Sequence, residues 1–129
     1  GYALCADRAL LERMYLAGQP WSVSVPAQAA GAAALRETAY RERVRSLVRR
    51  ERPWLTKRLG TLGLRVVPGE ANYLLFQSPV SLGEPLARRG ILLRSCANYM
   101  GLDETWYRTA VRTRRQNQRL VEALEEIVK

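Results

Sequence analysis

The spacing of apolar residues predicts a short helix near the start of the chain. Leu10, Leu11 and Met14 recur at intervals that place them on one helical face. Asp7 precedes them, where its carboxylate can accept a backbone hydrogen bond, and Gly18 follows as a residue typical of helix ends. We therefore expect a helix that begins after Asp7 and ends at Gly18.

A longer helical pattern covers residues 26–62, where apolar residues recur at three- and four-residue steps. They are Tyr40, Val44, Leu47, Val48, Leu55, Leu59 and Leu62. Gly31 and Pro53 interrupt the pattern, and a proline inside a helix removes a backbone hydrogen bond. We expect Pro53 to kink or divide the segment, so that two helices follow each other end to end.

The pattern then changes to short apolar runs separated by turn residues. Residues 64–67 and 72–77 read as strands joined by a turn at 68–71, which predicts a hairpin. Ser81 and Glu84 have capping-box spacing ahead of a helix at 85–89.

Gly90 is placed to end that helix. Residues 91–95 and 106–111 read as two further strands, and Thr113 with Gln116 begins a final helix. That helix carries Leu120, Val121, Leu124, Ile127 and Val128 on its apolar face. The order predicts an α+β fold, with a small, mostly antiparallel sheet packed against helices and preceded by long helices.

Two of the predicted strands each contain an arginine among apolar neighbours, Arg94 in the first and Arg108 in the second. A guanidinium cannot lose its charge, so a half-buried one must meet an anion or reach solvent. A bound carboxylate or phosphate is the specific possibility.

The composition limits the classes of function that are compatible with this chain. The chain has 129 residues, 47% hydrophobic and 26% charged, and no apolar run approaches the ~20 residues of a membrane span. The first residues do not have the pattern of a secretory signal, so we expect a cytoplasmic protein that does not contact the membrane. Histidine is absent and only Cys5 and Cys96 occur, which argues against zinc sites and histidine-based triads.

The net charge of +9 raises the possibility of nucleic-acid binding. Of the 21 basic residues only Lys57 and Lys129 are lysines, and many arginines lie in the long helical segment. Glu37, Glu42 and Glu51 interrupt that series, several within one helical turn of an arginine. We expect a solvated helix face and no nucleic-acid partner, with a basic nucleic-acid-binding or regulatory interaction module as the alternative.

Five segments occur in an order that resembles a known family: GYAL, PWSVSVPAQAA, VPGEANYLLF, RGILLRSCANYMGL and WYRTAVRTRRQNQRLVEAL. They resemble the C-terminal part of pyridoxal-phosphate enzymes of the aspartate-aminotransferase superfamily (fold type I). The likeness is greatest to the branch that holds threonine-phosphate decarboxylase and histidinol-phosphate aminotransferase. The RSCANYMGL stretch favours the decarboxylase, although Ser95 stands where its members commonly have an acidic residue.

The resemblance implies a domain organisation and a missing part. Residues 1–25 would be a remnant of the large domain with a connecting segment, and residues 26–129 the small domain with its interdomain helix at 26–62. In the family the lysine that binds the cofactor precedes the Gly-Tyr pair found here at the first two positions, and neither Lys57 nor Lys129 matches it. The resemblance thus implies an inactive fragment without bound pyridoxal phosphate, taken from a longer enzyme that is a homodimer.

The resemblance also implies roles for individual residues in binding a phosphorylated amino-acid substrate. Arg108 matches the arginine that binds the substrate carboxylate, and Arg94 one that helps to hold anionic groups, with a structural ion pair as its alternative. Arg112 shares the predicted sheet face of Arg108 but would lie ~13 Å away, which makes it a weaker candidate. Asn72 could face the cleft or serve the turn, and Asn98 and Tyr99 have the same two interpretations. Decarboxylation and amino-group transfer both remain open.

Overall fold

The computed structural model describes residues 4–128. Contacts divide the chain into two compact units, Gly1–Ala39 and Tyr40–Lys129. The predicted domain boundary after residue 25 stays a prediction. Among the described residues no helix combines the length and apolar character needed to cross a membrane.

The first unit contains two capped helices. Helix α1 (Arg8–Ala17) begins after Asp7, whose Oδ1 accepts a hydrogen bond from the Leu10 backbone at 3.1 Å, and Gly18 ends it. Helix α2 (Val25–Arg36) begins after Ser24, whose hydroxyl accepts from the Ala27 backbone. The short first helix is therefore confirmed together with its cap.

The long helical segment divides at a different place from the one predicted. Helix α3 (Thr38–Thr61) contains Pro53, and the break between α2 and α3 falls at Glu37. Gly31 lies inside α2. The proline costs about 3 kcal/mol in a helix interior. Leu55 and Leu59, both fully buried just after it, hold this part of α3 against the core despite that cost.

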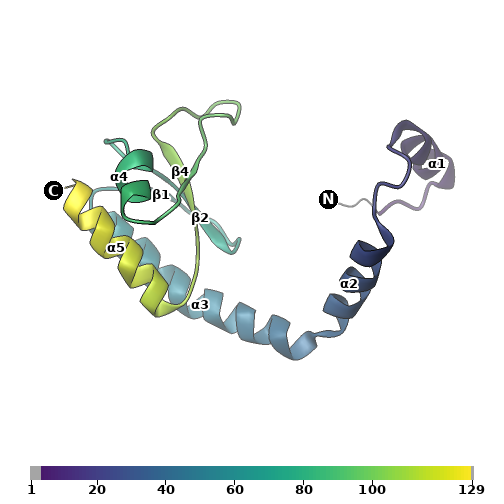
Figure 1. The fold of residues 1–129 in the computed structure, drawn as a ribbon, viewed down its shortest axis with the longest axis horizontal. Coiled ribbons are helices and arrows are strands. Elements are labelled where there is room, and N and C mark those ends of the chain that lie inside the picture. The colour runs from purple at the N-terminus through teal and green to yellow at the C-terminus, as the bar shows by residue number, and fades with distance from the viewer. Residues whose placement is uncertain (1–3, 129) are drawn as a thin grey trace. The chain divides into compact units, whose positions relative to one another are not determined.

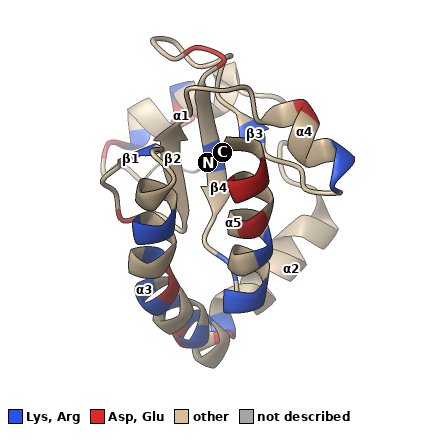
Figure 2. Ribbon diagram, turned by 90° about the vertical axis from the view of Figure 1, so that its left-hand side faces the viewer, with Lys and Arg blue, Asp and Glu red and all other residues tan. Residues whose placement is uncertain are grey.

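Four antiparallel strands form one sheet in the order β1-β2-β4-β3 (Figure 1 and Figure 2). Their bounds are Arg65–Val67 for β1, Tyr73–Gln77 for β2, Arg94–Ser95 for β3 and Trp106–Ala110 for β4. Strands β1 and β2 pair directly, so the predicted hairpin is confirmed. The mostly antiparallel α+β fold is confirmed as well.

One face of the sheet is covered by helices, and the core lies there. Helix α3 and helix α5 (Arg114–Val128) lie on the same side of the sheet, in front of the strands in Figure 2, and the short helix α4 (Gly83–Arg88) contacts α5. The fully buried core residues include Leu55, Leu59, Phe76, Leu82, Leu86 and Leu124. Alternate residues of β2 and β4, such as Leu75 and Arg108, face the other way and are only partly buried.

Two local predictions about the middle of this unit are wrong. The strand expected at residues 91–95 is reduced to Arg94–Ser95, because Leu92 is 90% exposed and has no strand partner. Helix α4 begins after Leu82, and no side chain caps it, so the capping box at Ser81 and Glu84 does not form. Gly90 does adopt a positive φ of 70° after α4, as its predicted role requires.

A buried carboxylate connects α3 to α5. Glu51 is 1% exposed and accepts from Arg114 Nε at 2.8 Å and from Arg50 Nε at 3.1 Å. The Arg114 hydrogen bond holds the pKa of the Glu51 carboxyl below its usual value, although burial acts in the opposite direction. Along α3, acidic residues are interleaved with the basic ones, whereas in α5 the basic residues come first and the acidic ones follow (Figure 2).

Candidate anion-binding site

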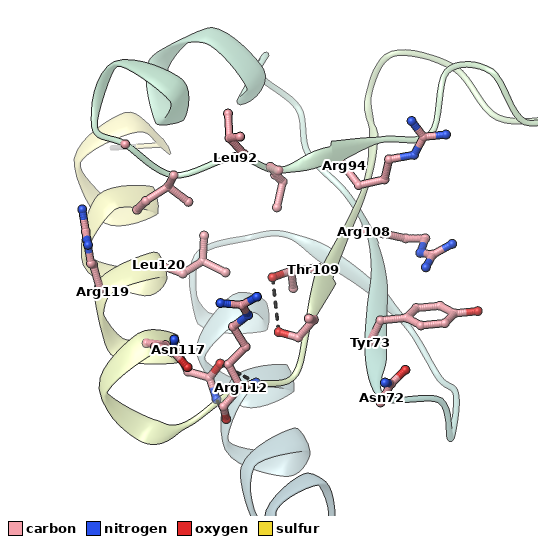
Figure 3. Close-up of a pocket in the computed structure, with 15 residues that line it drawn as sticks. Asn72, Tyr73, Leu92, Arg94, Arg108, Thr109, Arg112, Asn117, Arg119 and Leu120 are labelled. Carbon is pink, nitrogen blue, oxygen red and sulfur yellow. Dashed lines mark hydrogen bonds between the residues drawn. The ribbon is translucent and has the colours of Figure 1, made fainter. Parts of the chain in front are cut away.

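Arg108 is the centre of the candidate site. It projects from β4 on the open face of the sheet, and its guanidinium carbon lies 3.9 Å from the centre of the Tyr73 ring (Figure 3). Its Nη1 donates to the Tyr99 hydroxyl at 3.1 Å. Its Nε is enclosed and has no hydrogen-bond partner within residues 4–128. A buried donor without an acceptor costs about 1–3 kcal/mol, and a ligand atom that accepts a hydrogen bond from this nitrogen would remove that cost.

Arg94 lies directly opposite Arg108 in the pairing of β3 with β4. Its Nη2 donates to Asn98 Oδ1 at 3.0 Å, and its guanidinium lies 5.8 Å from the Tyr99 ring centre. Neither arginine forms a salt bridge with any carboxylate in the described part of the chain. The structural ion pair considered for Arg94 is therefore not what the structure contains. Arg94 is also exposed, and the expectation that its strand would half-bury it is wrong.

The two arginines line a pocket of about 700 Å³ between the C-terminal end of β4, residues 90–93 and α5. Asn72 and Tyr73 line it on the side of Arg108, and Arg112 and Arg119 line it near α5. None of the residues that line it is acidic. The electrostatic character of the pocket therefore favours an anion.

The structure separates Arg112 from Arg108. Strand β4 ends at Ala110, and Figure 3 shows Arg112 on the α5 side of the strand while Arg108 points away from α5. The Asn117 side chain holds the backbone of Arg112 there, accepting at 3.0 Å and donating at 2.8 Å. The prediction that Arg112 shares a sheet face with Arg108 is wrong, because the regular alternation of the strand stops before residue 112.

Asn72 lies just before β2 and on the same side as Tyr73 (Figure 3). Its backbone carbonyl accepts from the Val111 backbone at 2.9 Å, which extends the pairing of β2 with β4. Its side chain is exposed in the pocket wall. A ligand-binding role for Asn72 stays a prediction.

Tyr73 is the site residue that the sequence did not reveal. Leu75 is the partner of Arg108 in the pairing of β2 with β4, so Tyr73 is the diagonal neighbour of that arginine. The one signal in the sequence was that Tyr73 and Leu75 are two residues apart in a predicted strand, so both lie on one strand face. That face also carries Arg108. A stacked ring fixes the guanidinium plane and leaves its edges free for hydrogen bonds.

The described residues do not supply an amine for a covalently bound cofactor. Lys57 is exposed on α3 and does not line the pocket. Lys129 is outside the described residues. Within residues 4–128 no cluster of acidic or sulfur ligands could hold a metal ion. The pocket can thus bind and orient an anion, and no lysine of residues 4–128 lines it.

Residues 1–124 match the family "Aminotransferase class I and II", and the chain belongs to this family. Its members depend on pyridoxal phosphate, as the sequence motifs implied. Among individual relatives, the chain is 39% identical over 132 residues to threonine-phosphate decarboxylase of Salmonella typhimurium, covering 99% of this chain and 36% of the relative. It is 40% identical over 119 residues to histidinol-phosphate aminotransferase of Symbiobacterium thermophilum, covering 90% and 32%.

Solved structures agree with the sequence matches. Histidinol-phosphate aminotransferase from Clostridium acetobutylicum superposes with a TM-score of 0.81 at 25% identity, over 95% of this chain and 38% of that one. L-threonine-O-3-phosphate decarboxylase from Porphyromonas gingivalis gives 0.72 at 25% identity, over 93% and 39%. The chain spans about a third of the length of the curated relatives it matches.

Proposed function

We propose that this chain forms the small domain of a pyridoxal-phosphate enzyme acting on a phosphorylated amino acid, and that the enzyme decarboxylates O-phosphothreonine. The observation that carries the proposal is Arg108, a stacked guanidinium with an enclosed, unpartnered Nε and no carboxylate partner within residues 4–128. The 39% identity to threonine-phosphate decarboxylase over nearly the whole chain supports the choice of reaction.

The contribution of the chain is to bind and orient the substrate. Arg108 uses Nη1 for Tyr99, which leaves Nη2 and the enclosed Nε along one edge of the fork. A carboxylate placed against that edge would accept two parallel hydrogen bonds. Arg94, opposite in the sheet, would bind the second anionic group. Pyridoxal phosphate, when bound by the whole enzyme, supplies the electron sink, and the direction in which Arg108 holds the carboxylate selects the bond that breaks.

The second candidate is histidinol-phosphate aminotransferase. The structure of that enzyme from C. acetobutylicum superposes with the higher TM-score, 0.81 against 0.72. In this reaction Arg108 would bind the phosphate of one substrate and the carboxylate of the amino-group partner in turn. Both candidates use a guanidinium that has no competing carboxylate.

The deciding experiment offers the whole enzyme O-phosphothreonine alone and, separately, histidinol phosphate with 2-oxoglutarate. Release of carbon dioxide and aminopropanol phosphate from the first supports the decarboxylase. Formation of glutamate in the second supports the aminotransferase and rejects the decarboxylase. No turnover of either substrate rejects the whole proposal.

Five further statements belong to the same proposal. The whole enzyme is a homodimer, acts in the cytoplasm and does not bind nucleic acid. The 129-residue chain alone is inactive and forms no covalent adduct with pyridoxal phosphate. Borohydride treatment with the cofactor, followed by mass spectrometry, tests the last statement, and a pyridoxyl label on one defined lysine would contradict it.

A further inference from the structure

The turn that follows β3 has a backbone fixed to the sheet. Cys96 is fully buried, and its N–H donates to the Trp106 carbonyl at 2.8 Å. The Tyr99 N–H donates to the Cys96 carbonyl at 2.9 Å, and the Leu102 N–H donates to the Tyr99 carbonyl at 3.1 Å. Asn98 and Tyr99, the last two residues of this turn, therefore have defined backbone positions.

Each of these two residues accepts a hydrogen bond from a different arginine. Asn98 Oδ1 accepts from Arg94 Nη2 at 3.0 Å, and the Tyr99 hydroxyl accepts from Arg108 Nη1 at 3.1 Å. The arginines are partners across β3 and β4, so adjacent residues of one turn hold adjacent guanidinium groups. The hydroxyl proton of Tyr99 has no acceptor within residues 4–128 and can also donate to a bound anion.

Both acceptors are uncharged, which distinguishes this pair of arginines from others in the same unit. Arg58 pairs with Glu125 at 2.6 Å, and Arg114 pairs with Glu51. A carboxylate at either turn position would orient its arginine equally well but would cancel the charge. Like charges at opposite strand positions destabilise a sheet, and an anion bound between them removes that penalty.

We infer that Asn98 and Tyr99 are positioning residues that hold Arg94 and Arg108 without neutralising them. They thereby set the affinity of the pocket for a ligand with two anionic groups, the carboxylate and phosphate of a phosphorylated amino acid. This inference rests on the proposed function, because it takes the two arginines as the substrate-binding groups.

Two substitutions test whether Asn98 and Tyr99 orient the two arginines while leaving their charges free for a ligand, or serve only the structure of the turn. Tyr99→Phe removes only the hydroxyl that holds Arg108. Asn98→Asp keeps the acceptor for Arg94 but adds the charge that the inference excludes. Binding of O-phospho-L-threonine is measured on the 129-residue chain at fixed ionic strength by NMR of the arginine Nε–Hε groups. The enclosed Nε of Arg108 makes its proton a sensitive reporter.

We expect each substitution to raise the Kd about tenfold, the equivalent of one lost hydrogen bond to a charged group. The matched controls are Tyr40→Phe and Gln118→Glu, which make the same chemical changes at exposed positions of α3 and α5. Their Kd should stay within about twofold of the original chain. Asn98→Asp should also leave the thermal midpoint unchanged or higher, because an exposed ion pair with Arg94 contributes little to stability.

Each outcome has a distinct meaning. If Asn98→Asp binds the ligand as tightly as Gln118→Glu, and Tyr99→Phe as tightly as Tyr40→Phe, the inference is wrong and the anion-binding role of the arginines stands. If the unchanged chain does not bind O-phospho-L-threonine, the inference fails, whereas the proposed function is still decided by turnover of that substrate in the whole enzyme. Weakened binding with an unchanged midpoint supports the inference.

Discussion

Replacing Glu51 with glutamine removes the charge of a buried carboxylate and keeps its shape. The side chain of Glu51 is 2% exposed and accepts from Arg114 Nε at 2.8 Å, Arg114 Nη2 at 3.5 Å and Arg50 Nε at 3.1 Å. Glutamine retains one acceptor oxygen, but its amide group would direct N–H donors at a guanidinium. We therefore expect Glu51→Gln to destabilise the unit formed by residues 40–129.

The size of the effect follows from the exposure of the partners. Breaking a fully buried ion pair costs about 3–5 kcal/mol, mostly because the remaining charge stays buried. Here the side chains of Arg114 and Arg50 are 44% and 70% exposed, so both can regain water. The lost interactions are then hydrogen bonds to a charged acceptor, and we expect a decrease of about 2–3 kcal/mol in the free energy of unfolding.

Urea unfolding followed by circular dichroism at pH 7 measures this change, with Glu42→Gln as the matched control. Glu42 lies in the same helix and pairs with Arg45 at 2.8 Å, but its side chain is 57% exposed. We expect the control to lose less than about 0.5 kcal/mol. Equal losses in the two variants would refute the argument that burial makes the Glu51 pair important.

The same pair predicts a pH dependence. The Arg114 hydrogen bond lowers the pKa of Glu51 in the folded state below its usual value of 4.5. A lowered folded-state pKa means that the unfolded state binds the proton first as the pH falls. The contribution of Glu51 is therefore complete above pH 4.5 and is lost as the pH falls through the lower folded-state pKa. The stability difference between the original chain and Glu51→Gln should shrink over that range.

The remaining predictions concern the core, the site and the basic surface. Leu59→Ala should lower the free energy of unfolding by about 2–5 kcal/mol, because Leu59 is fully buried, whereas Leu92→Ala should change it by less than about 0.5 kcal/mol in the same urea assay. In the whole enzyme, Arg108→Ala should raise KM and lower kcat, and the change in kcat/KM should correspond to a loss of more than ~2 kcal/mol of transition-state stabilisation. Arg115→Ala, on the exposed face of α5, should not have this effect. Unchanged kinetics for Arg108→Ala would reject its assignment. The chain should not bind duplex DNA or RNA in gel-shift assays at low salt, and binding that weakens steeply with salt would contradict this prediction.

The sequence predicted the strands and helices whose burial alternates regularly. Strands β2 and β4 and helix α5 follow apolar periods of two and about 3.6, and the structure contains them within one or two residues. The pattern failed where packing against distant segments decides the outcome. Pro53 does not break α3, because residues that follow it are locked in the core. Apolar residues 91–93 do not form a strand, although their composition is typical of one.

The site could be predicted only in part for a related reason. Arg94 and Arg108 stand out from the sequence, since each is a permanent charge among apolar neighbours. The stacking of Tyr73 on Arg108 depends on the register of β2 against β4, which no local pattern reveals. The position of Arg112 depends on where β4 ends, and beyond that end its backbone N–H donates to Asn117 Oδ1.

Arg108 and Arg114 show how one chain uses the same side chain in two ways. Both guanidinium groups stack on an aromatic ring, Arg108 on Tyr73 at 3.9 Å and Arg114 on Trp54 at 4.3 Å. Arg114 completes its interactions with the carboxylate of Glu51, and its charge is compensated within the fold. Arg108 is held by a phenol, keeps its charge and has an Nε with no acceptor in residues 4–128. The ring orients the arginine in both cases, and the charge of the remaining partner decides whether that arginine stabilises the fold or is available to a ligand.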